Sequence, residues 1–170
     1  IEMNNPRDAI EAGIGMVHQH FMLIQPFTVT ENIVLGTEPV KGVSLDMETA
    51  RKNVVEISER YGLSIDPDAK IEDISVGMQQ RVEILKALYR GADILILDEP
   101  TSSLTPQEIR ELIEIMHNLT ADGKSIIIIT HNLGVAAYMS DQIVVMKHGE
   151  IADAGDRGDG LLHGRAFFTV

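Results

Sequence analysis

The 170-residue sequence contains no cysteine, so neither a disulfide framework nor thiol chemistry is available to it. Basic residues are also scarce, since 14 Lys and Arg stand against 26 Asp and Glu and the net charge is −12. This charge argues against nucleic acid as a partner, because phosphate contacts need a basic surface. No apolar run approaches the length of a membrane span, and no basic-then-apolar leader opens the sequence. The sequence therefore predicts a soluble protein.

The apolar content, in contrast, is sufficient for one folded domain, because 44% of the residues are hydrophobic. Two aliphatic runs, 94–97 and 126–129, do not alternate with polar residues, which predicts strands buried on both faces. Between them, residues 105–108 form a capping box with proline at the first helical position, and Gly123 ends the predicted helix. A strand, a helix and a strand of these lengths predict a right-handed βαβ unit. The expected fold class is therefore α/β, a mostly parallel sheet with flanking helices.

Polar side chains follow both predicted strands. Asp98 and Glu99 come directly after the first, and His131 follows the second. In an open parallel sheet ligands lie outside the carboxyl ends of the strands, so these three residues are expected at one edge. Two carboxylates about 4 Å apart repel by about 4 kcal/mol at an effective dielectric of about 20, and no Lys or Arg between Asp93 and Thr105 offsets this. The edge therefore predicts a bound cation such as Mg²⁺ and a charged substrate.

The rest of the chain carries weaker signals. Gly62 and Gly91 stop two predicted helices, and Ser75 is placed to cap the start of the second. The remaining predicted elements are a short helix from Pro6, a strand at 14–17, a helical turn from Thr30, a helix at 46–61, a helix at 76–90, a helix from Leu133 and a hairpin of strands 143–147 and 150–154. Gly and charged residues dominate 156–170, which is left as a tail without assigned structure.

Four motifs occur in a characteristic order along the sequence. They are the Q-loop at 15–19, the signature at 74–81, the acidic pair at 98–99 and the histidine at 131. Together they resemble the nucleotide-binding domain of an ATP-binding-cassette (ABC) transporter, a P-loop NTPase-like fold. The resemblance divides residues 1–155 of this partial ATPase domain into a helical signature subdomain at about 20–91 and a core βαβ unit at about 92–155.

The resemblance implies a role for each polar residue at the predicted edge. Asp98 would bind Mg²⁺, and Glu99 would orient or deprotonate the water that attacks ATP. His131 would contact the γ-phosphate, where charge develops in the transition state. Gln19 of the Q-loop would reach the metal and the attacking water. Glu99 and His131 are thus the expected catalytic residues, and Asp98 and Gln19 the expected metal ligands.

The resemblance also implies partners. Ser75, Gly77 and Gln79 of the signature would bind ATP held by a second cassette, because a helix N-terminus favours an anion. Residues 21–36, which begin at Phe21 and end at Gly36, would face the membrane permease domains. The protein would then lie at the cytoplasmic face of the cell membrane.

Residues that differ from the broad family pattern indicate which branch of the family the sequence resembles. Val76 and Met78 stand where the broad family has Gly and Gln, and the surrounding signature resembles the importers of simple sugars and nucleosides. Thr105 stands where many members have Asp. The expected function is the ATP-binding subunit of such an importer, although the sequence does not identify the transported molecule.

The phosphate-cradling loop of the family is expected upstream of Pro6 and is not in the sequence, so we expect a cassette truncated before the Q-loop and inactive alone. Residues 123–125 imitate the end of that loop but lie between a helix and a strand, the reverse of the required order. Two alternatives stay open, a non-catalytic interaction module and a soluble ABC ATPase outside transport. The second is disfavoured because no coiled coil separates Gln19 from Ser75 and the charge does not suit DNA.

Overall fold

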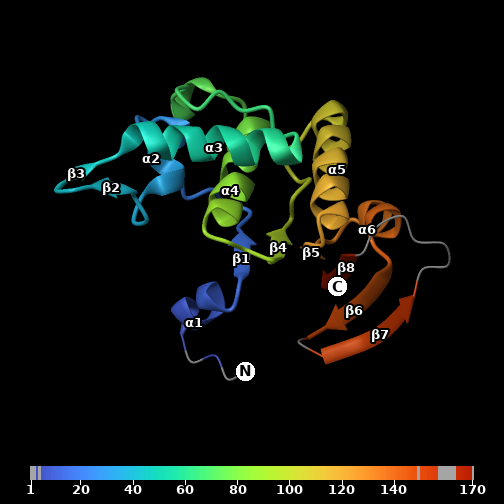
Figure 1. Ribbon diagram of the computed structural model, residues 1–170. Helices are drawn as coiled ribbons and strands as arrows, with labels where there is room; N and C mark the ends of the chain where they lie inside the picture. The colour runs from blue at the N-terminus through green and yellow to red at the C-terminus, as the bar shows by residue number, and fades with distance from the viewer. Residues whose placement is uncertain (1–2, 4, 149, 157–163, 170) are drawn as a thin grey trace.

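The computed structural model describes residues 3, 5–148, 150–156 and 164–169, and its centre is a six-stranded sheet (Figure 1). The strand order is β1-β4-β5-β8-β6-β7, and neighbouring strands are parallel except for the antiparallel pair β6–β7. The bounds are β1 Ile14–Val17, β4 Ile94–Asp98, β5 Ser125–Ile129, β6 Gln142–Lys147, β7 Glu150–Asp156 and β8 Gly164–Thr169. The predicted mostly parallel sheet is confirmed.

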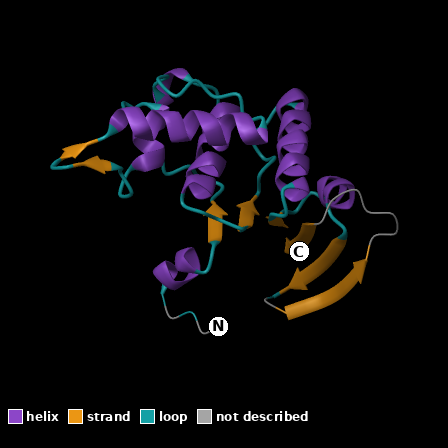
Figure 2. Ribbon diagram, viewed as in Figure 1, coloured by secondary structure: helices purple, strands orange, loops and turns teal. Residues whose placement is uncertain are grey.

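The helices are α1 Pro6–Glu11, α2 Val29–Val34, α3 Met47–Tyr61, α4 Val76–Tyr89, α5 Pro106–Ala121 and α6 Leu133–Met139, with a 3₁₀ turn at Ile71–Asp73. A small hairpin of β2 Val40–Lys41 and β3 Ser44–Leu45 precedes α3. Figure 2 shows α2, α3, α4 and α5 together on one side of the strands, whereas α1 lies at the amino end of β1. The elements within 20–91 are thus helices and one small hairpin, and the division into subdomains stays a prediction.

Local capping explains where the long helices begin and end. The Thr105 side chain accepts from the Glu108 amide while the Glu108 side chain accepts from the Thr105 amide, which confirms the predicted capping box. Asp46 caps the start of α3, and Gly62 ends it in the left-handed conformation at φ 71°. Ser75 caps α4 by accepting from Met78, as predicted.

The sheet core is less symmetrical than the aliphatic runs predict. Leu95 and Leu97 of β4 are fully buried with α4 and α5, whereas Ile94 and Ile96 on the other face are only partly covered. Strand β5 alternates in the same way. The prediction that both faces are fully buried was therefore wrong, because an aliphatic run does not show how much of each face the helices cover.

The last strand has no counterpart in the predicted elements. Gly164–Thr169 form β8, which lies between β5 and β6 and runs parallel to both. Long-range pairing defines this strand, and its short sequence gave no local period to detect. The rest of the tail left unassigned by the sequence, 157–163 and 170, is outside the described residues. In the described part of the chain, no helix combines the length and apolar character needed to cross a bilayer.

Candidate functional site

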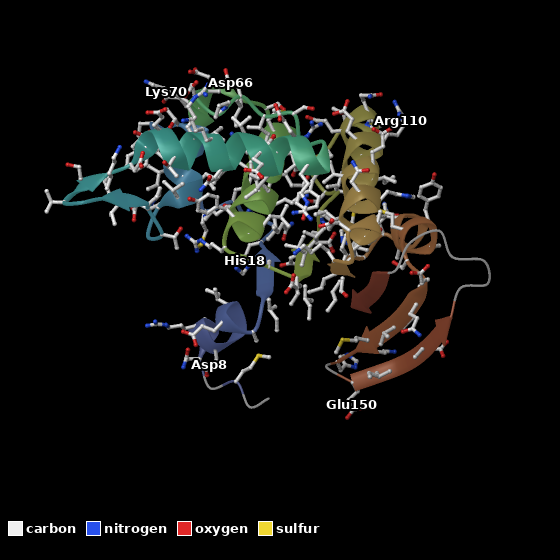
Figure 3. All side chains as sticks on the ribbon, in the orientation of Figure 1. Asp8, His18, Asp66, Lys70, Arg110 and Glu150 are labelled. Carbon is white, nitrogen blue, oxygen red and sulfur yellow. The ribbon has the colours of Figure 1, made fainter. Side chains whose placement is uncertain are left out.

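The candidate site lies at the carboxyl ends of β1, β4 and β5, which are neighbours in the sheet. The parallel register pairs Val17 with Leu97 and Asp98 with Ile129, so the segments that follow these strands leave at the same edge. Figure 3 labels His18 at the end of β1, next to α4. The predicted meeting of Asp98, Glu99 and His131 at one edge is confirmed.

Glu99 is held by groups that follow β5. Its Oε1 accepts the His131 backbone N–H at 2.9 Å and lies 2.7 Å from His131 Nδ1. The Thr130 hydroxyl donates to Oε2 at 3.3 Å. The Glu99 side chain is 15% exposed and that of His131 is 74% exposed. No Lys or Arg of the nearby sequence meets Glu99; its hydrogen-bond partners come instead from the segment that follows the neighbouring strand.

The backbone of Glu99 is also unusual. Its φ is +48°, in the left-handed region that residues other than glycine rarely adopt. Its amide donates to the Ile129 carbonyl at 2.8 Å, and its carbonyl accepts from the amide and hydroxyl of Ser102 at 3.2 and 3.0 Å. These bonds hold a conformation that costs about 1–3 kcal/mol, and such strain is concentrated at functional sites.

A pocket of about 290 Å³ opens beside this pair. Its lining includes Gln19, Gln79, Asp98 and Glu99, four of the predicted site residues. His131 is outside this lining but contacts Glu99, which is part of it. Carboxylates and amides of this kind can hold a hydrated cation and orient a water molecule.

The polar side chains of the pocket suit a hydrated Mg²⁺ rather than a metal held by protein ligands alone. The described residues contain no cluster of three or more His, Asp or Glu that could cage a metal by themselves. Mg²⁺ in phosphate-transfer sites is usually held by one or two carboxylates, with water and substrate phosphates completing the shell. Asp98 with Gln19 in the pocket fits this second kind of site.

Ser75 and Gly77 lie outside this pocket, at the N-terminus of α4. Ser75 is exposed and Gly77 is buried. The Ser75 hydroxyl donates to Glu108 Oε1 at 3.2 Å. The pKa of Glu108 is lowered, chiefly by the Thr105 amide and hydroxyl, and also by Ser75 and the Gly77 amide. The structure thus places Ser75 and Gly77 outside the pocket, whereas Val76 and Gln79 of the same signature line it.

Two glutamines of α4 have structural partners. Gln79 Nε2 donates to the Ile71 and Ile74 carbonyls, each at 3.3 Å, and so fixes the turn that enters α4. Gln80, only 3% exposed, donates to the Pro100 carbonyl at 2.8 Å. Gln80 thereby ties α4 to the segment that follows Glu99, a role that the sequence analysis missed.

Glu83 makes a second such connection. It is 8% exposed, and its Oε1 accepts the Met22 amide at 2.8 Å while Lys86 Nζ lies 3.3 Å from Oε2. This joins α4 to the segment just after Gln19. Since 61 positions separate Glu83 from Met22, no local sequence signal could have revealed the contact.

The segment 21–36, predicted to face a permease, combines a fixed backbone with exposed apolar side chains. The buried Asn32 side chain accepts from the Ile24 amide at 2.7 Å and donates to its carbonyl at 3.0 Å. Met22 is 78% exposed, and Ile24, Phe27 and Leu35 are between 36% and 42% exposed. The surface is therefore ordered and partly apolar.

Lys124 lies at the opposite end of the sheet. Its Nζ is 2.7 Å from Asp93 Oδ1, where β4 and β5 begin. The prediction that residues 123–125 only imitate a phosphate loop is confirmed, because this lysine pairs with a carboxylate at the amino ends of the strands.

A family model described as ABC transporter matches residues 1–102. The chain is 60% identical over 157 residues to the nucleoside import ATP-binding protein NupA of Lactococcus lactis subsp. cremoris (strain MG1363), covering 92% of this chain and 31% of NupA. It is 58% identical over 150 residues to the guanosine import ATP-binding protein NupO of Bacillus subtilis (strain 168), covering 88% and 29%.

A solved structure gives the corresponding comparison for the fold. The ATP-binding cassette MJ0796, in a dimeric post-hydrolysis state bound to ADP and Pi, superposes with a TM-score of 0.72 at 26% identity. The match covers 94% of this chain and 70% of that chain. Against NupA and NupO, this chain spans about a third of the length of the relatives it matches.

Proposed function

The chain belongs to the ABC transporter family and has its cassette fold, and from this premise we propose that it is part of the ATP-binding protein of an importer. In that protein, ATP binding and hydrolysis would be coupled to the uptake of a nucleoside. NupA and NupO, both named for nucleoside import, support this cargo over a simple sugar, the other candidate.

The observation that carries the proposal is the acidic edge at the ends of β4 and β5. Asp98, Glu99 and His131 meet there beside a pocket that also contains Gln19. The opposite end of the same strands holds a balanced ion pair instead. A concentration of acidic groups at the carboxyl edge of a parallel sheet suits a Mg²⁺-bound phosphate substrate.

Each residue of the edge has a distinct role in the proposed reaction. Mg²⁺, held by Asp98 with Gln19, would neutralise charge on the phosphates of bound ATP. Glu99 accepts a hydrogen bond from the attacking water and orients it or removes its proton. His131 donates to the γ-phosphate, and the high exposure of its ring leaves it able to turn from Glu99 toward a substrate.

The proposal requires a second cassette. Ser75, Gly77 and Gln79 would contact ATP held by that partner. The position of Ser75 and Gly77 outside the pocket of their own chain supports this, whereas Gln79 lines that pocket. Residues 21–36 would form the contact with the permease. Their ordered backbone and exposed apolar side chains support this role.

The experiment is ATP binding and hydrolysis by the full-length protein that carries this chain, assembled with its permease. Glu99→Gln should leave Mg²⁺-ATP binding within about threefold and lower hydrolysis by at least about 100-fold, because it removes the base but keeps the shape. Glu114→Gln, on the exposed side of α5, is the control and should leave both unchanged. Normal hydrolysis by Glu99→Gln would contradict the proposal.

A further inference from the structure

A single carboxylate connects the N-termini of two helices. Glu108 lies in the first turn of α5, where its Oε2 accepts the amide and hydroxyl of Thr105 at 2.9 and 2.8 Å. Its Oε1 reaches α4, where the Ser75 hydroxyl donates at 3.2 Å and the nearby Gly77 amide helps to lower the pKa of Glu108. The two oxygens of Glu108 therefore satisfy donors of two different helices.

The fit at α4 is close. A Cβ added to Gly77 would lie 2.4 Å from Glu108 Oε1 and 2.7 Å from Glu108 Cδ, so only glycine leaves room for the carboxylate. The first turn of α4 has no acidic residue of its own. Because the N-terminus of a helix favours a negative charge, Glu108 supplies from α5 the charge that α4 lacks.

Glu108 meets α4 at Ser75, which donates to it, and at Gly77, which it closely approaches; these are residues assigned above to the phosphate of a second cassette. We propose that Glu108 is an intramolecular occupant of this anion position and must withdraw before a phosphate can bind there. This inference rests on the proposed function, and it adds a residue that sets the affinity of α4 for phosphate. Two anions cannot share the same donors without strong repulsion.

The hydrogen bonds show how Glu108 can withdraw without disrupting α5. The capping box uses Oε2 alone, since both Thr105 groups donate to that oxygen. Only Oε1 faces α4. A rotation of the side chain can therefore break the bonds to α4 while one oxygen remains available to the cap.

The test is a titration of the isotope-labelled chain with inorganic pyrophosphate, followed by the NMR signals of the Gly77 and Met78 amides. Glu108→Gln removes the competing charge and should bind pyrophosphate at least about tenfold more tightly than the unmodified chain. Glu111→Gln is the matched control, because Glu111 is on the same helix but pairs with Arg81 and Gln107. It should bind like the unmodified chain.

A second variant tests whether a change in binding comes from a change in folding. Glu108→Asp keeps the charge but is one methylene shorter, so it should lose the reach to α4 and bind about threefold more tightly, less than Glu108→Gln. Thermal melts should show both variants folded. Equal or weaker binding by both variants, or no response of the Gly77 and Met78 amides in any chain, would overturn the inference. These results would leave ATP hydrolysis and its loss in Glu99→Gln unaffected, so failure of the proposed function is seen separately.

Discussion

The amino ends and the carboxyl ends of strands β4 and β5 differ in charge, although they belong to the same two strands. At the amino ends, Asp93 and Lys124 form one ion pair. At the carboxyl ends, Asp98 and Glu99 stand together, and within the described part of the chain His131 and Thr130 contact Glu99 alone of these two carboxylates. The amino end is balanced and needs no ligand. The carboxyl end has unbalanced charge and a strained residue, which is the character of a site rather than of a scaffold.

The largest effect is expected when one carboxylate at each end of the strands is replaced by its isosteric amide. Glu99→Gln should lower ATP hydrolysis by at least about 100-fold, whereas Asp93→Asn should lower it less than twofold. The reason is that only Glu99 borders the pocket with Asp98. Steady-state hydrolysis by the assembled full-length protein measures both, and a similar loss in the two variants would remove the distinction between the ends.

A change in β1, the strand that leads into the segment with Gln19, should destabilise the fold through packing alone. A Cβ at Gly15 would lie 2.9 Å from the Cβ atoms of both Ala87 and Ala92. Gly15→Ala should therefore destabilise the fold by about 1–3 kcal/mol, because these neighbours cannot move far. Denaturant unfolding measures this. A control is Glu56→Gln at an exposed position of α3, and equal stability of Gly15→Ala and the original chain would refute the prediction.

Loss of the helix cap at Thr105 should have a smaller effect on stability, and this effect should depend on pH. Thr105→Ala should cost about 1 kcal/mol through loss of the N-cap. The folded-state pKa of Glu108 is lowered from 4.5 by the Thr105 donors, so its contribution to stability is present above pH 4.5 and is lost as the pH falls through the folded pKa. The variant should therefore show a flatter loss of stability in this acidic range.

Thermal melts at a series of pH values check both parts of that prediction. Ser103→Ala, an exposed change just before the cap, is the control and should keep the original pH profile. A Thr105→Ala profile that falls as steeply as the original below pH 4.5 would show that the cap does not set the pKa of Glu108.

The smallest effect is expected at the balanced end. Lys124→Ala should cost at most about 1 kcal/mol, because the partner Asp93 side chain is 76% exposed. Hydrolysis should not change. Melting the variant at low and high salt measures the effect, which should shrink as salt screens the pair. A loss of more than about 2 kcal/mol in the free energy of unfolding would mean that the fold depends on this ion pair.

The parts of this fold that the sequence predicts are those fixed by neighbouring residues. The capping box at Thr105 and the stop at Gly62 are local, and the order of strands and helix places Asp98 and His131 at one edge. Contacts between distant segments escaped prediction, such as Ser75 with Glu108 over 33 positions. Their donors are ordinary polar residues whose partners depend on how helices pack.

The missed features of the site have the same cause. The amide of Met22 meets Glu83, and Gln80 reaches the carbonyl of Pro100, only after α4 has docked on the sheet. The roles given to Gln19, Asp98 and the signature came from the family resemblance, since isolated glutamine and aspartate carry little information. Geometry supports the proximity of Gln19 and Asp98 in one pocket, and their chemistry stays a prediction.

The position of β8 has a consequence for the order in which the protein assembles. Among the described strands, β8 lies between β5 and the β6–β7 hairpin, although β8 follows both in the chain. On the ribosome, the hairpin emerges before the strand that anchors it. Pairing of β5 with β8 must also close a long loop, which slows folding. Until that pairing forms, β5 presents an open edge that another chain could occupy, so the late arrival of β8 sets a window for misassembly.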